Sequence, residues 1–474
     1  MNKSANNSAF TRIQSLLDAG SFVEIGANVN ARSTNFHLYK EQTPADGVIT
    51  GYGLIDGRLV YVYSQDSSVL GGSIGEMHSR KITQLYDMAL KMGAPVIGIL
   101  DCSGIRLQES TDALQGLGSI YQKQALASGV IPQFTIVMGN CGGGVSILPA
   151  LSDFTFVESK KGNLFLQSPN TIPENSREKC DTSSADWKAS HSQNIDICGT
   201  TEEIYAEVRR LIGILPSNNR FSVVQEPCVD NLNRLCEGIN NVAGDTTTIL
   251  SMLGDNYEYI ETKKFTAKEM STGFIRLNGM TIGCIANCQN EANTAETYPD
   301  VLTADGMKKA ASFVKFCDAF HIPVLTLCNI SGFESSFEAE IETPAACASL
   351  IAAYSYATVP KVTVVLEKAM GSAGTIMGSK SLGTDLVYAW NNAQIGAMDG
   401  IHAAKILYEG ESAATIREKA KEYDALLNEA DSAAAHGYVD ALINPEDTRK
   451  YLISAFEMLA TKTEARSYKK HPSV

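Results

Sequence analysis

The sequence has no apolar segment long enough to cross a membrane. Its longest apolar runs, residues 94–100 and 135–138, have the length of a β-strand, whereas a membrane helix needs about 20 residues. The first ten residues are rich in Asn and Ser, with one lysine and no arginine, which is not the pattern of a signal or transit peptide. We therefore expect a cytoplasmic protein without direct membrane insertion.

Residue pairs with the spacing of metal ligands are also missing. None of the eleven cysteines forms a C-x-x-C pair, and the nearest two are Cys284 and Cys288. The seven histidines form no H-x-x-x-H or H-E-x-x-H pair. We expect the cysteines to be buried thiols in a reducing compartment, and the sequence predicts no metal site.

Basic residues are scarce relative to acidic ones. The 474 residues include 39 Lys and Arg but 53 Asp and Glu, which gives a net charge of −14. Nucleic-acid-binding proteins normally have the opposite balance, so no nucleic acid partner is predicted. The hydrophobic content of 44% is typical of globular proteins, and the length exceeds what one hydrophobic core usually supports.

One offset of 228 residues relates the two halves of the chain. It connects Pro95 with Pro323, Gly104 with Gly332, Pro132 with Pro360, and Gly143 with Gly371. In each half a strand-like run precedes a glycine turn, and long helices are predicted over residues 76–92 and 304–320. This alternation predicts an α/β architecture. The repeat predicts two domains, residues 1–225 and 226–474, related by internal duplication.

Further signals along the chain mark turns, an insertion and a tail. The dipeptides Asp56-Gly57 and Asn278-Gly279 predict one hairpin turn in each half. Residues 167–200 are polar and are interpreted as an insertion over the first domain, and the tail around residues 413–434 is predicted to be helical.

Glycine-rich turns follow two predicted strands in each half. Such turns leave backbone N–H groups unpaired, and two facing turns direct two donors at one point, as in an oxyanion hole. The candidate donors are Gly104, Ile105, Gly143 and Gly144 in the first half and Gly332, Phe333, Ser372 and Ala373 in the second. One glycine turn alone is usually just a tight turn. The spacing of 39 residues between the two turns, found in both halves, favours a site.

Seven motifs follow one another in the order of a known protein family. They are TPADGVITGYG (43–53), GGSIGE (71–76), RLQE (106–109), ASGVIP (127–132), FCDAF (316–320), ATVPKV (357–362) and HGYVD (436–440). Through them the sequence resembles, from about residue 12 to residue 451, the biotin-dependent acyl-CoA carboxyltransferases. These include the β subunits of propionyl-CoA and acetyl-CoA carboxylases and the α subunits of methylmalonyl-CoA and glutaconyl-CoA decarboxylases.

The resemblance implies two tandem crotonase-like (ClpP/crotonase) ββα-spiral domains. It implies that the N-terminal domain binds acyl-CoA and the C-terminal domain binds biotin. The active site would form between protomers of a homo-oligomer, either a dimer or a trimer of dimers. The eight donors named above would be catalytic. Further contacts to CoA or biotin are then expected from Gly71, Gly72, Ser73, Gly142, Gly371 and Thr375, the last where the family tunes acyl-chain size.

The implied reaction needs neither a protein base nor a metal in this subunit. A carboxyl group passes between carboxybiotin and the α-carbon of a short-chain acyl-CoA, with propionyl-CoA or acetyl-CoA as the first choice. Two backbone oxyanion holes stabilise the enolates. Because the sequence has no biotinylation string and no P-loop, biotin is expected on a separate biotin carboxyl carrier protein. A biotin carboxylase or a membrane decarboxylase subunit would complete the complex.

Several alternatives stay open. The first is the α subunit of a methylmalonyl-CoA or glutaconyl-CoA decarboxylase, which runs the same transfer in reverse. Residues 71–75 also match the G-x-S-x-G pattern of serine hydrolases, with Ser73 as the nucleophile. An inactive relative or a scaffold is the third, because Ser103, Ser331 and Ser372 stand where the family usually has Gly, Pro and Gly.

Four charged or titratable residues near these motifs have simpler interpretations. Arg80 and Lys81 are interpreted as solvated surface charges rather than as ligands of the CoA phosphates. Asp101 is expected to brace the first glycine turn, and His78 is at most a neighbour of the CoA site.

Overall fold

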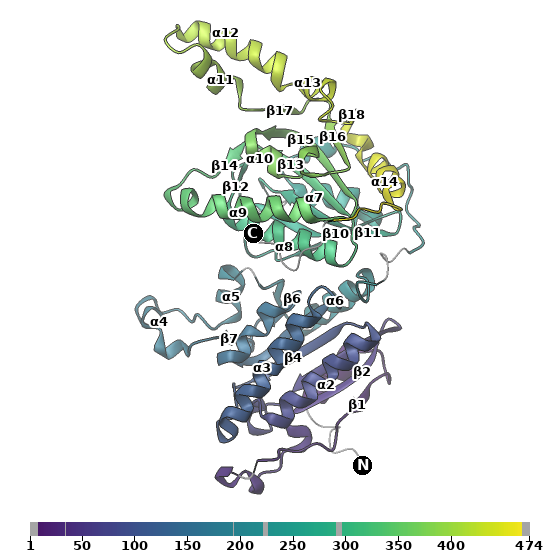
Figure 1. Ribbon diagram of the computed structural model, residues 1–474, viewed down its shortest axis with the longest axis vertical. Helices are drawn as coiled ribbons and strands as arrows, with labels where there is room; N and C mark the ends of the chain where they lie inside the picture. Colours follow the sequence, from purple (N-terminus) through teal and green to yellow (C-terminus); the bar gives the residue numbers. More distant parts are fainter. Residues whose placement is uncertain (1–7, 34, 193, 221–225, 291–295, 467–474) are drawn as a thin grey trace. The chain divides into compact units, whose positions relative to one another are not determined.

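The chain divides into two compact units, Met1–Ser222 and Val223–Val474, each with one large sheet and flanking helices (Figure 1). The structure is a computed structural model, and it describes residues 8–33, 35–192, 194–220, 226–290 and 296–466. The predicted boundary after residue 225 falls at the end of segment 221–225, which lies outside the described residues. Within the described ranges, no helix is long and apolar enough to span a membrane.

The first unit contains a mostly parallel sheet of eight strands. In sheet order these are β1 (Val23–Ile25), β2 (Val48–Ile55), β3 (Arg58–Gln65), β4 (Val96–Cys102), β5 (Gln133–Gly142), β6 (Phe154–Glu158) and β8 (Ile197–Gly199), and β7 (Asn163–Phe165) pairs with β5. The first three strands are antiparallel neighbours and the remaining pairs are parallel. The α/β prediction is therefore confirmed for this unit.

One helix of the first unit coincides with the helix predicted over residues 76–92. The helices of this unit are α1 (Ser8–Leu16), α2 (Glu76–Met92), α3 (Ser110–Ala127), α4 (Pro173–Glu178), α5 (Ala185–His191) and α6 (Thr201–Ile214). Helices α2 and α3 pack on each other, and α1 and α6 pack on strands of the sheet. The short helices α4 and α5 belong to the polar insertion. Helix α2 ends at Gly93, whose left-handed conformation is the usual C-terminal cap.

The second unit has the same strand order. Its sheet comprises β9 (Ile260–Thr262), β10 (Met270–Leu277), β11 (Met280–Asn287), β13 (Val324–Ile330), β15 (Lys361–Met370), β16 (Leu386–Trp390) and β18 (Ala441–Ile443), with β17 (Gln394–Gly396) on β15. A separate two-stranded sheet joins β12 (Val301–Leu302) and β14 (Gly332–Phe333). Its helices are α7 (Thr246–Leu253), α8 (Ala304–Ala319), α9 (Phe337–Tyr356), α10 (Gly371–Ile376), α11 (Gly400–Leu407), α12 (Ala413–Tyr423), α13 (Ala430–Ala435) and α14 (Thr448–Leu459).

The central strands of the two sheets also share their register. Features that recur 228 residues apart are the pairs Val96–Gln133 and Val324–Lys361, and the register shifts that follow Leu100 and Cys328. A shift of this kind at a strand end redirects the chain. Both β4 and β13 therefore leave their sheets just before a glycine turn.

Tight turns connect the antiparallel strands of each unit. Asp56 and Gly57 have φ angles of 48° and 77°, and Asn278 and Gly279 have 50° and 75°. Two consecutive positive φ angles define the hairpin turn that suits the twist of paired strands. Both predicted hairpins are confirmed.

An arginine and an aspartate close the first unit at its hairpin turn. The Asp18 carboxylate accepts hydrogen bonds from the backbone N–H groups of Asp56 and Gly57. Arg209 of α6 donates to Asp18 at 2.8 Å and to the carbonyl of Leu16 at 2.9 Å. The staple, as we call this Asp–Arg pair, joins the first helix, the hairpin turn and α6.

The second unit contains the same staple. The Asp255 carboxylate accepts from the N–H groups of Asn278 and Gly279. Arg449 of α14 donates to Asp255 at 2.6 Å and to the carbonyl of Leu253 at 2.5 Å. The two staples therefore use the same hydrogen-bond pattern, but Arg449 is completely buried whereas the Arg209 side chain is 29% exposed.

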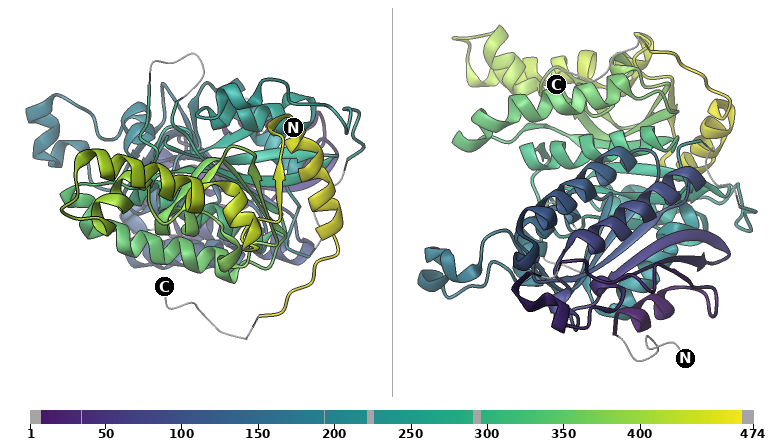
Figure 2. Two further views of the ribbon diagram at one scale, coloured as in Figure 1. Left: turned by 90° about the horizontal axis from the view of Figure 1, so that it is seen from above. Right: turned by 60° about the horizontal axis from the view of Figure 1, so that its bottom comes forward.

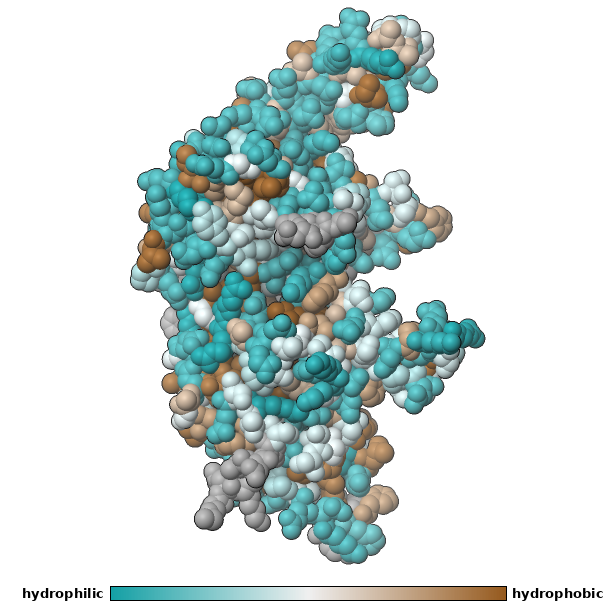
Figure 3. All heavy atoms as spheres, turned by 180° about the vertical axis from the view of Figure 1, so that it is seen from behind, coloured by the Kyte–Doolittle hydropathy of each residue, from teal (hydrophilic) through white to brown (hydrophobic). Residues whose placement is uncertain are grey.

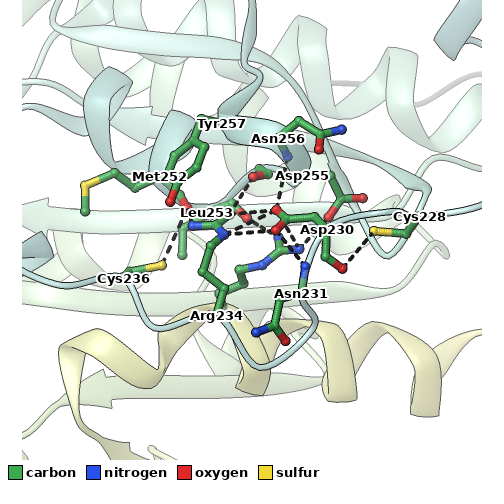
Figure 4. Close-up of polar contacts among 12 residues, drawn as sticks. Cys228, Asp230, Asn231, Arg234, Cys236, Met252, Leu253, Asp255, Asn256 and Tyr257 are labelled. Atoms are coloured by element: carbon green, nitrogen blue, oxygen red, sulfur yellow. Dashed lines mark hydrogen bonds and ion pairs between the residues drawn. The ribbon is translucent and has the colours of Figure 1, made fainter.

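A neighbouring ion pair extends the second staple. Arg234 binds the Asp230 carboxylate and the carbonyls of Met252 and Gly254, and it lies over the ring of Tyr257, 4.1 Å from the ring centre (Figure 4). Arg449 also contacts Asp230, at 3.4 Å. These contacts attach the segment that enters the second unit to the helix that ends it.

The predicted helical tail forms an arm on the second unit. Helices α11 and α12 pack on each other and are followed by a π turn and α13. Figures 1 and 2 show this pair reaching past the sheet of the second unit. Several apolar side chains of the arm are exposed, among them Ile406, Leu407 and Leu426, and Figure 3 shows separate hydrophobic patches at this end.

Candidate active site

Two loops of the first unit run side by side where β4 ends. Ser103 N–H donates to the carbonyl of Gly71 at 3.0 Å, Ile74 N–H to that of Gly104 at 2.9 Å, and Arg106 N–H to that of Ile74 at 2.8 Å. Successive N–H groups of an extended chain point in opposite directions, so the N–H of Ile105 points away from the paired loop. Among the described residues it has no hydrogen-bond acceptor.

Gly104 brings this loop against the second glycine turn. Its φ of 122° is accessible to glycine and strained for other residues, and a Cβ atom there would lie 3.6 Å from the carbonyl oxygen of Gly142. The Gly104 N–H donates to the Cys102 sulfur at 3.3 Å. Of the two predicted donors in this turn, Ile105 therefore has the N–H that is left for a ligand.

The second turn of the first unit follows β5. Gly143 has a φ of 61° and begins a short 3₁₀ turn, Gly143–Ile147, whose first N–H groups have no partner within the turn. Gly144 is packed so closely that a Cβ would lie 2.8 Å from the Tyr121 hydroxyl and 2.9 Å from Leu117. That hydroxyl donates to the Gly144 carbonyl at 2.5 Å and fixes the turn.

The second unit brings together the donors predicted for its own glycine turns. Glu334 N–H donates to the carbonyl of Leu302 at 3.0 Å, so the N–H of Phe333 on β14 points away from β12, as that of Ile105 does in its loop. Helix α10 contacts β14 and begins at Gly371, with a φ of 60°. The N–H groups of Ser372 and Ala373 lie in its unpaired first turn.

A pocket of about 850 Å³ opens beside α10 in the second unit. Gly371, Ser372 and Thr375 line it together with apolar residues of β15 and β16. His436 and Tyr438, from the predicted HGYVD motif, line another side of it. The Thr375 hydroxyl donates to the carbonyl of Gly371 at 3.3 Å. The structure thus places backbone donors and the candidate acyl-size residue at one cavity.

The other predicted contact residues lie beside the first turn. Gly71 and Gly72 both have positive φ angles, and a Cβ on Gly72 would lie 2.2 Å from the carbonyl of Asp101. Ser73 is buried, and its hydroxyl accepts from Arg106 Nε at 3.4 Å. Within the described ranges no imidazole or carboxylate accepts a hydrogen bond from Ser73. The arrangement of a hydrolase nucleophile and base is therefore not found there.

Lys81 differs from its predicted place at the surface. Its ammonium group is buried and donates to the carbonyls of Ala45, at 2.9 Å, and Val48. Burial lowers its pKa to about 8. Arg80, the next residue back along α2, is exposed as expected. Helical geometry explains the difference, because only one of two adjacent residues faces the loop before β2.

Asp101 has the bracing role expected for it. Its carboxylate accepts from Arg12 at 2.8 Å and from the Ser67 hydroxyl at 2.9 Å. Its backbone N–H donates to the Gln65 side chain at 3.2 Å. In the second unit Asn329 is held in the same way by Asn287, at 2.7 Å. A neighbouring side-chain amide therefore fixes the strand end before each glycine turn.

His78 is a core residue that is neutral in the folded protein. Its Nδ1 faces the Asp46 carbonyl at 2.9 Å and therefore carries the proton, while Nε2 accepts from Gln65 Nε2 at 3.2 Å. Burial, with the nearby charges of Arg106 and Lys81, lowers its pKa from 6.5 to about 3. Both ring nitrogens have hydrogen-bond partners, so His78 belongs to the scaffold behind the loops.

Replacing His78 with Gln should weaken the pH dependence of stability. Between pH 6.5 and about 3 the unfolded chain binds a proton at His78 that the folded chain does not bind. The wild-type free energy of unfolding therefore falls, relative to His78→Gln, by about 1.4 kcal/mol for each pH unit from 6 to 4. Urea unfolding of both proteins across this range measures the difference. Parallel pH profiles would contradict the assignment.

Sequence reasoning did not find the buried charges behind the first turn. Arg106, Asp46 and Glu109 lie in motifs that were used only for the family resemblance, and the structure joins them in one ion cluster. The only available signal was the presence of an arginine directly after the candidate donor Ile105. Groups of three metal-ligating side chains are not found in the part of the chain that the structure describes.

Comparison with known proteins identifies the family of this chain. A family model described as the carboxyl transferase domain matches residues 2–474, and the chain belongs to that family. The resemblance deduced from the seven motifs is confirmed.

Relatives with known names match over nearly the whole chain. The propionyl-CoA carboxylase beta chain of Roseobacter denitrificans is 37% identical, over 98% of this chain and 92% of the relative. The methylmalonyl-CoA decarboxylase subunit alpha of Propionigenium modestum is also 37% identical, over 99% and 93%. The crystal structure of the transcarboxylase 12S hexamer, with methylmalonyl-coenzyme A and methylmalonic acid bound, matches with a TM-score of 0.92 at 35% identity, over 98% and 92%.

Proposed function

We propose that this chain moves a carboxyl group between carboxybiotin on a carrier protein and the α-carbon of a short-chain acyl-CoA. Propionyl-CoA or acetyl-CoA is the first choice. The observation that carries the proposal is the unbonded N–H of Ile105 beside the Gly142–Gly144 turn. In the second unit the N–H of Phe333, which points away from β12, has the corresponding place beside α10. Two holes of this kind suit a reaction in which two carbonyl oxygens gain negative charge.

In this proposal the first unit binds the acyl-CoA thioester. The N–H of Ile105, together with the first N–H groups of the Gly143–Ile147 turn, stabilises the oxygen of the thioester enolate. Gly104 and Gly142 shape the hole by their close approach, and Gly71, Gly72 and Ser73 support the adjoining loop. Thr375 is exposed on α10 of the second unit, and it is proposed to limit the length of an acyl group bound by the first unit of another protomer.

The second unit is proposed to bind the biotin group. The apolar pocket, lined by Gly371 and Ser372 at the start of α10, fits an uncharged ring system with one polar carbonyl. Bound there, biotin supplies the carboxyl group and a ureido nitrogen that takes up the α-proton. Phe333, Ser372 and Ala373 stabilise the ureido oxygen by their N–H groups.

The matching topologies of the two units support a common origin. We infer two tandem crotonase-like domains, residues 1–225 and 226–474, that arose by duplication. The shared strand order, the matching bulges and the paired staples support this inference. Gly332 and Gly104 then have equivalent places in the two holes.

The proposed complex contains further proteins. Biotin arrives on a biotin carboxyl carrier protein, and a biotin carboxylase or a membrane decarboxylase subunit performs the other half-reaction. The chain is proposed to form a cytoplasmic homo-oligomer, a dimer or a trimer of dimers, and the hexameric transcarboxylase 12S supports this. The exposed apolar residues of the α11–α12 arm suit a place in such an assembly.

A transfer assay with free biotin tests the function. Purified protein is incubated with biotin and malonyl-CoA, methylmalonyl-CoA or glutaconyl-CoA, and loss of the carboxylated thioester is followed. Turnover of one thioester identifies the acyl group. The 37% identity to a decarboxylase subunit keeps the reverse direction as a second candidate. Isolation of the native complex distinguishes them, because a co-purifying biotin carboxylase indicates net carboxylation and a co-purifying membrane decarboxylase subunit indicates the reverse direction. No transfer, even with the carrier present, would refute the function.

A further inference from the structure

The side chain of Arg106 is completely buried directly behind the proposed first oxyanion hole. Its Nη1 donates to Asp46 at 2.6 Å and to Glu109 at 2.8 Å, and its Nη2 donates to the carbonyl of Ser73 at 2.9 Å. No part of the Asp46 side chain is exposed, and only 2% of the Glu109 side chain is. Burying three charges is costly unless they hold a defined geometry, so the cluster needs an explanation.

Arg106 binds the loop that runs beside the hole through two neighbouring residues, Ser73 and Ile74. Its own backbone N–H binds the Ile74 carbonyl, and its guanidinium binds the neighbouring Ser73 carbonyl. The loop that carries the Ile105 N–H is thus tied to residues 73–74 by both the backbone and the side chain of Arg106. The Gly104 carbonyl shares a peptide group with the Ile105 N–H and accepts a hydrogen bond from the N–H of Ile74, so a rotation of this peptide would break that bond.

The two carboxylates extend the cluster to the start of α2. Glu109 accepts from the N–H of Glu76 at 2.5 Å, and Asp46 accepts from the N–H of His78 at 2.7 Å. These are N–H groups of the first helical turn, which have no partner within the helix. A Cβ on Gly75 would lie 2.4 Å from the Arg106 guanidinium, so the loop passes the cluster without spare room.

The second hole lacks this cluster. The residue 228 positions after Arg106 is Glu334, which is exposed, and the residue 228 positions after Glu109 is Phe337, which is 79% exposed. In the part of the second unit that is described, β14 is held by its pairing with β12 instead. The buried cluster is therefore not a requirement of the shared fold, and it is specific to the hole of the first unit.

We propose that Arg106, held by Asp46 and Glu109, is a positioning residue that aims the Ile105 N–H at the thioester oxygen. The inference rests on the proposed function. A donor displaced by about 1 Å costs on the order of 100-fold in rate. Because the enolate gains its charge only during the reaction, misplacing the donor lowers kcat and leaves the KM for the acyl-CoA almost unchanged.

The test compares Arg106→Lys and Glu109→Gln with a matched control, Arg449→Lys. Arg449 is equally buried and also paired with two aspartates, but it belongs to the staple of the second unit. All proteins are assayed for carboxyl transfer to biotin, and their thermal midpoints are measured. We expect Arg106→Lys to lower kcat about 100-fold and Glu109→Gln to lower it about 10-fold, each with KM within threefold of wild type. Arg449→Lys is expected to lose a comparable amount of thermal midpoint but to keep kcat within threefold of wild type.

Other outcomes separate the possible failures. An unchanged kcat in Arg106→Lys, or a rise in KM alone, would overturn the positioning role. Equal losses of activity in the Arg106 and Arg449 variants would show that the buried cluster only stabilises the fold and does not position the donor. Wild-type protein without transfer activity would instead refute the proposed function itself. Glu109→Gln keeps the guanidinium in place, so it gives an answer even if Arg106→Lys does not fold.

Discussion

Replacing Ile105 with proline is expected to lower kcat for carboxyl transfer by about 100- to 1,000-fold. Proline removes the backbone N–H that the structure leaves without an acceptor among the described residues, and it removes no hydrogen bond of the fold. The preceding residue is a glycine, which tolerates a following proline well. Steady-state kinetics with a carboxylated acyl-CoA and biotin measure the effect, and KM is expected to change little.

Leu107→Pro is the matched control in the same loop. Leu107 is 78% exposed and is the first residue of a 3₁₀ turn, where a missing N–H is tolerated. Its predecessor, Arg106, has an extended conformation with ψ of 105°, which suits a residue before proline. We expect kcat to stay within threefold of wild type. A similar loss in both proline variants would mean that the loop was distorted, and the Ile105 N–H would lose its role.

Proline at Gly143 or Gly371 would not give an equivalent test. These glycines have φ angles of 61° and 60°, whereas the proline ring fixes φ near −65°. Such a variant would have to rebuild the turn, so a loss of activity would not be attributable to one donor. Gly143 and Gly371 are therefore excluded as proline sites by backbone angles that the sequence does not contain.

The sequence was sufficient for the paired architecture because the repeated landmarks keep one spacing. The 228-residue offset holds for the β4 and β13 strand ends, their bulges and both glycine turns, since these parts form a continuous segment without insertions. The staples could not be found from the sequence, because the spacing between their equivalent residues differs from 228. Asp18 and Asp255 are 237 residues apart, and Arg209 and Arg449 are 240 apart. Only the hydrogen bonds show that they are equivalent.

The glycine turns of the candidate site could be predicted from the sequence, but the hydrogen-bond partners of its individual N–H groups and its buried charges could not. Glycine turns could be found because few residues tolerate positive φ. The sequence did not reveal that the Cys102 sulfur accepts the hydrogen bond of the Gly104 N–H, because that contact depends on one side-chain rotamer. It also did not reveal that Lys81 and Arg106 are buried. Charged residues are rarely buried, and two of their partners here, Ala45 and Asp46, come from a loop far away in the chain.

Replacing Arg449 with methionine is expected to destabilise the second unit by about 3–5 kcal/mol. The change leaves the buried Asp255 carboxylate without its guanidinium partner, and it removes the hydrogen bond to the Leu253 carbonyl. Trp390 is a suitable reporter, because its indole N–H donates at 3.0 Å to the hydroxyl of Thr448, the residue next to Arg449. Urea unfolding followed by Trp390 fluorescence, in a Trp187→Phe background, measures the loss within this unit.

Arg209→Met is the matched control, because it breaks the same pattern of hydrogen bonds at a more exposed position. The side chains of Arg209 and Asp18 are about 30% exposed, so water replaces much of the lost interaction, and a cost of about 1 kcal/mol or less is expected. Far-ultraviolet circular dichroism during urea unfolding measures it. If burial sets the strength of the staple, Arg449→Met is the more damaging change by several-fold. Equal losses would show that both staples act through their hydrogen-bond pattern alone.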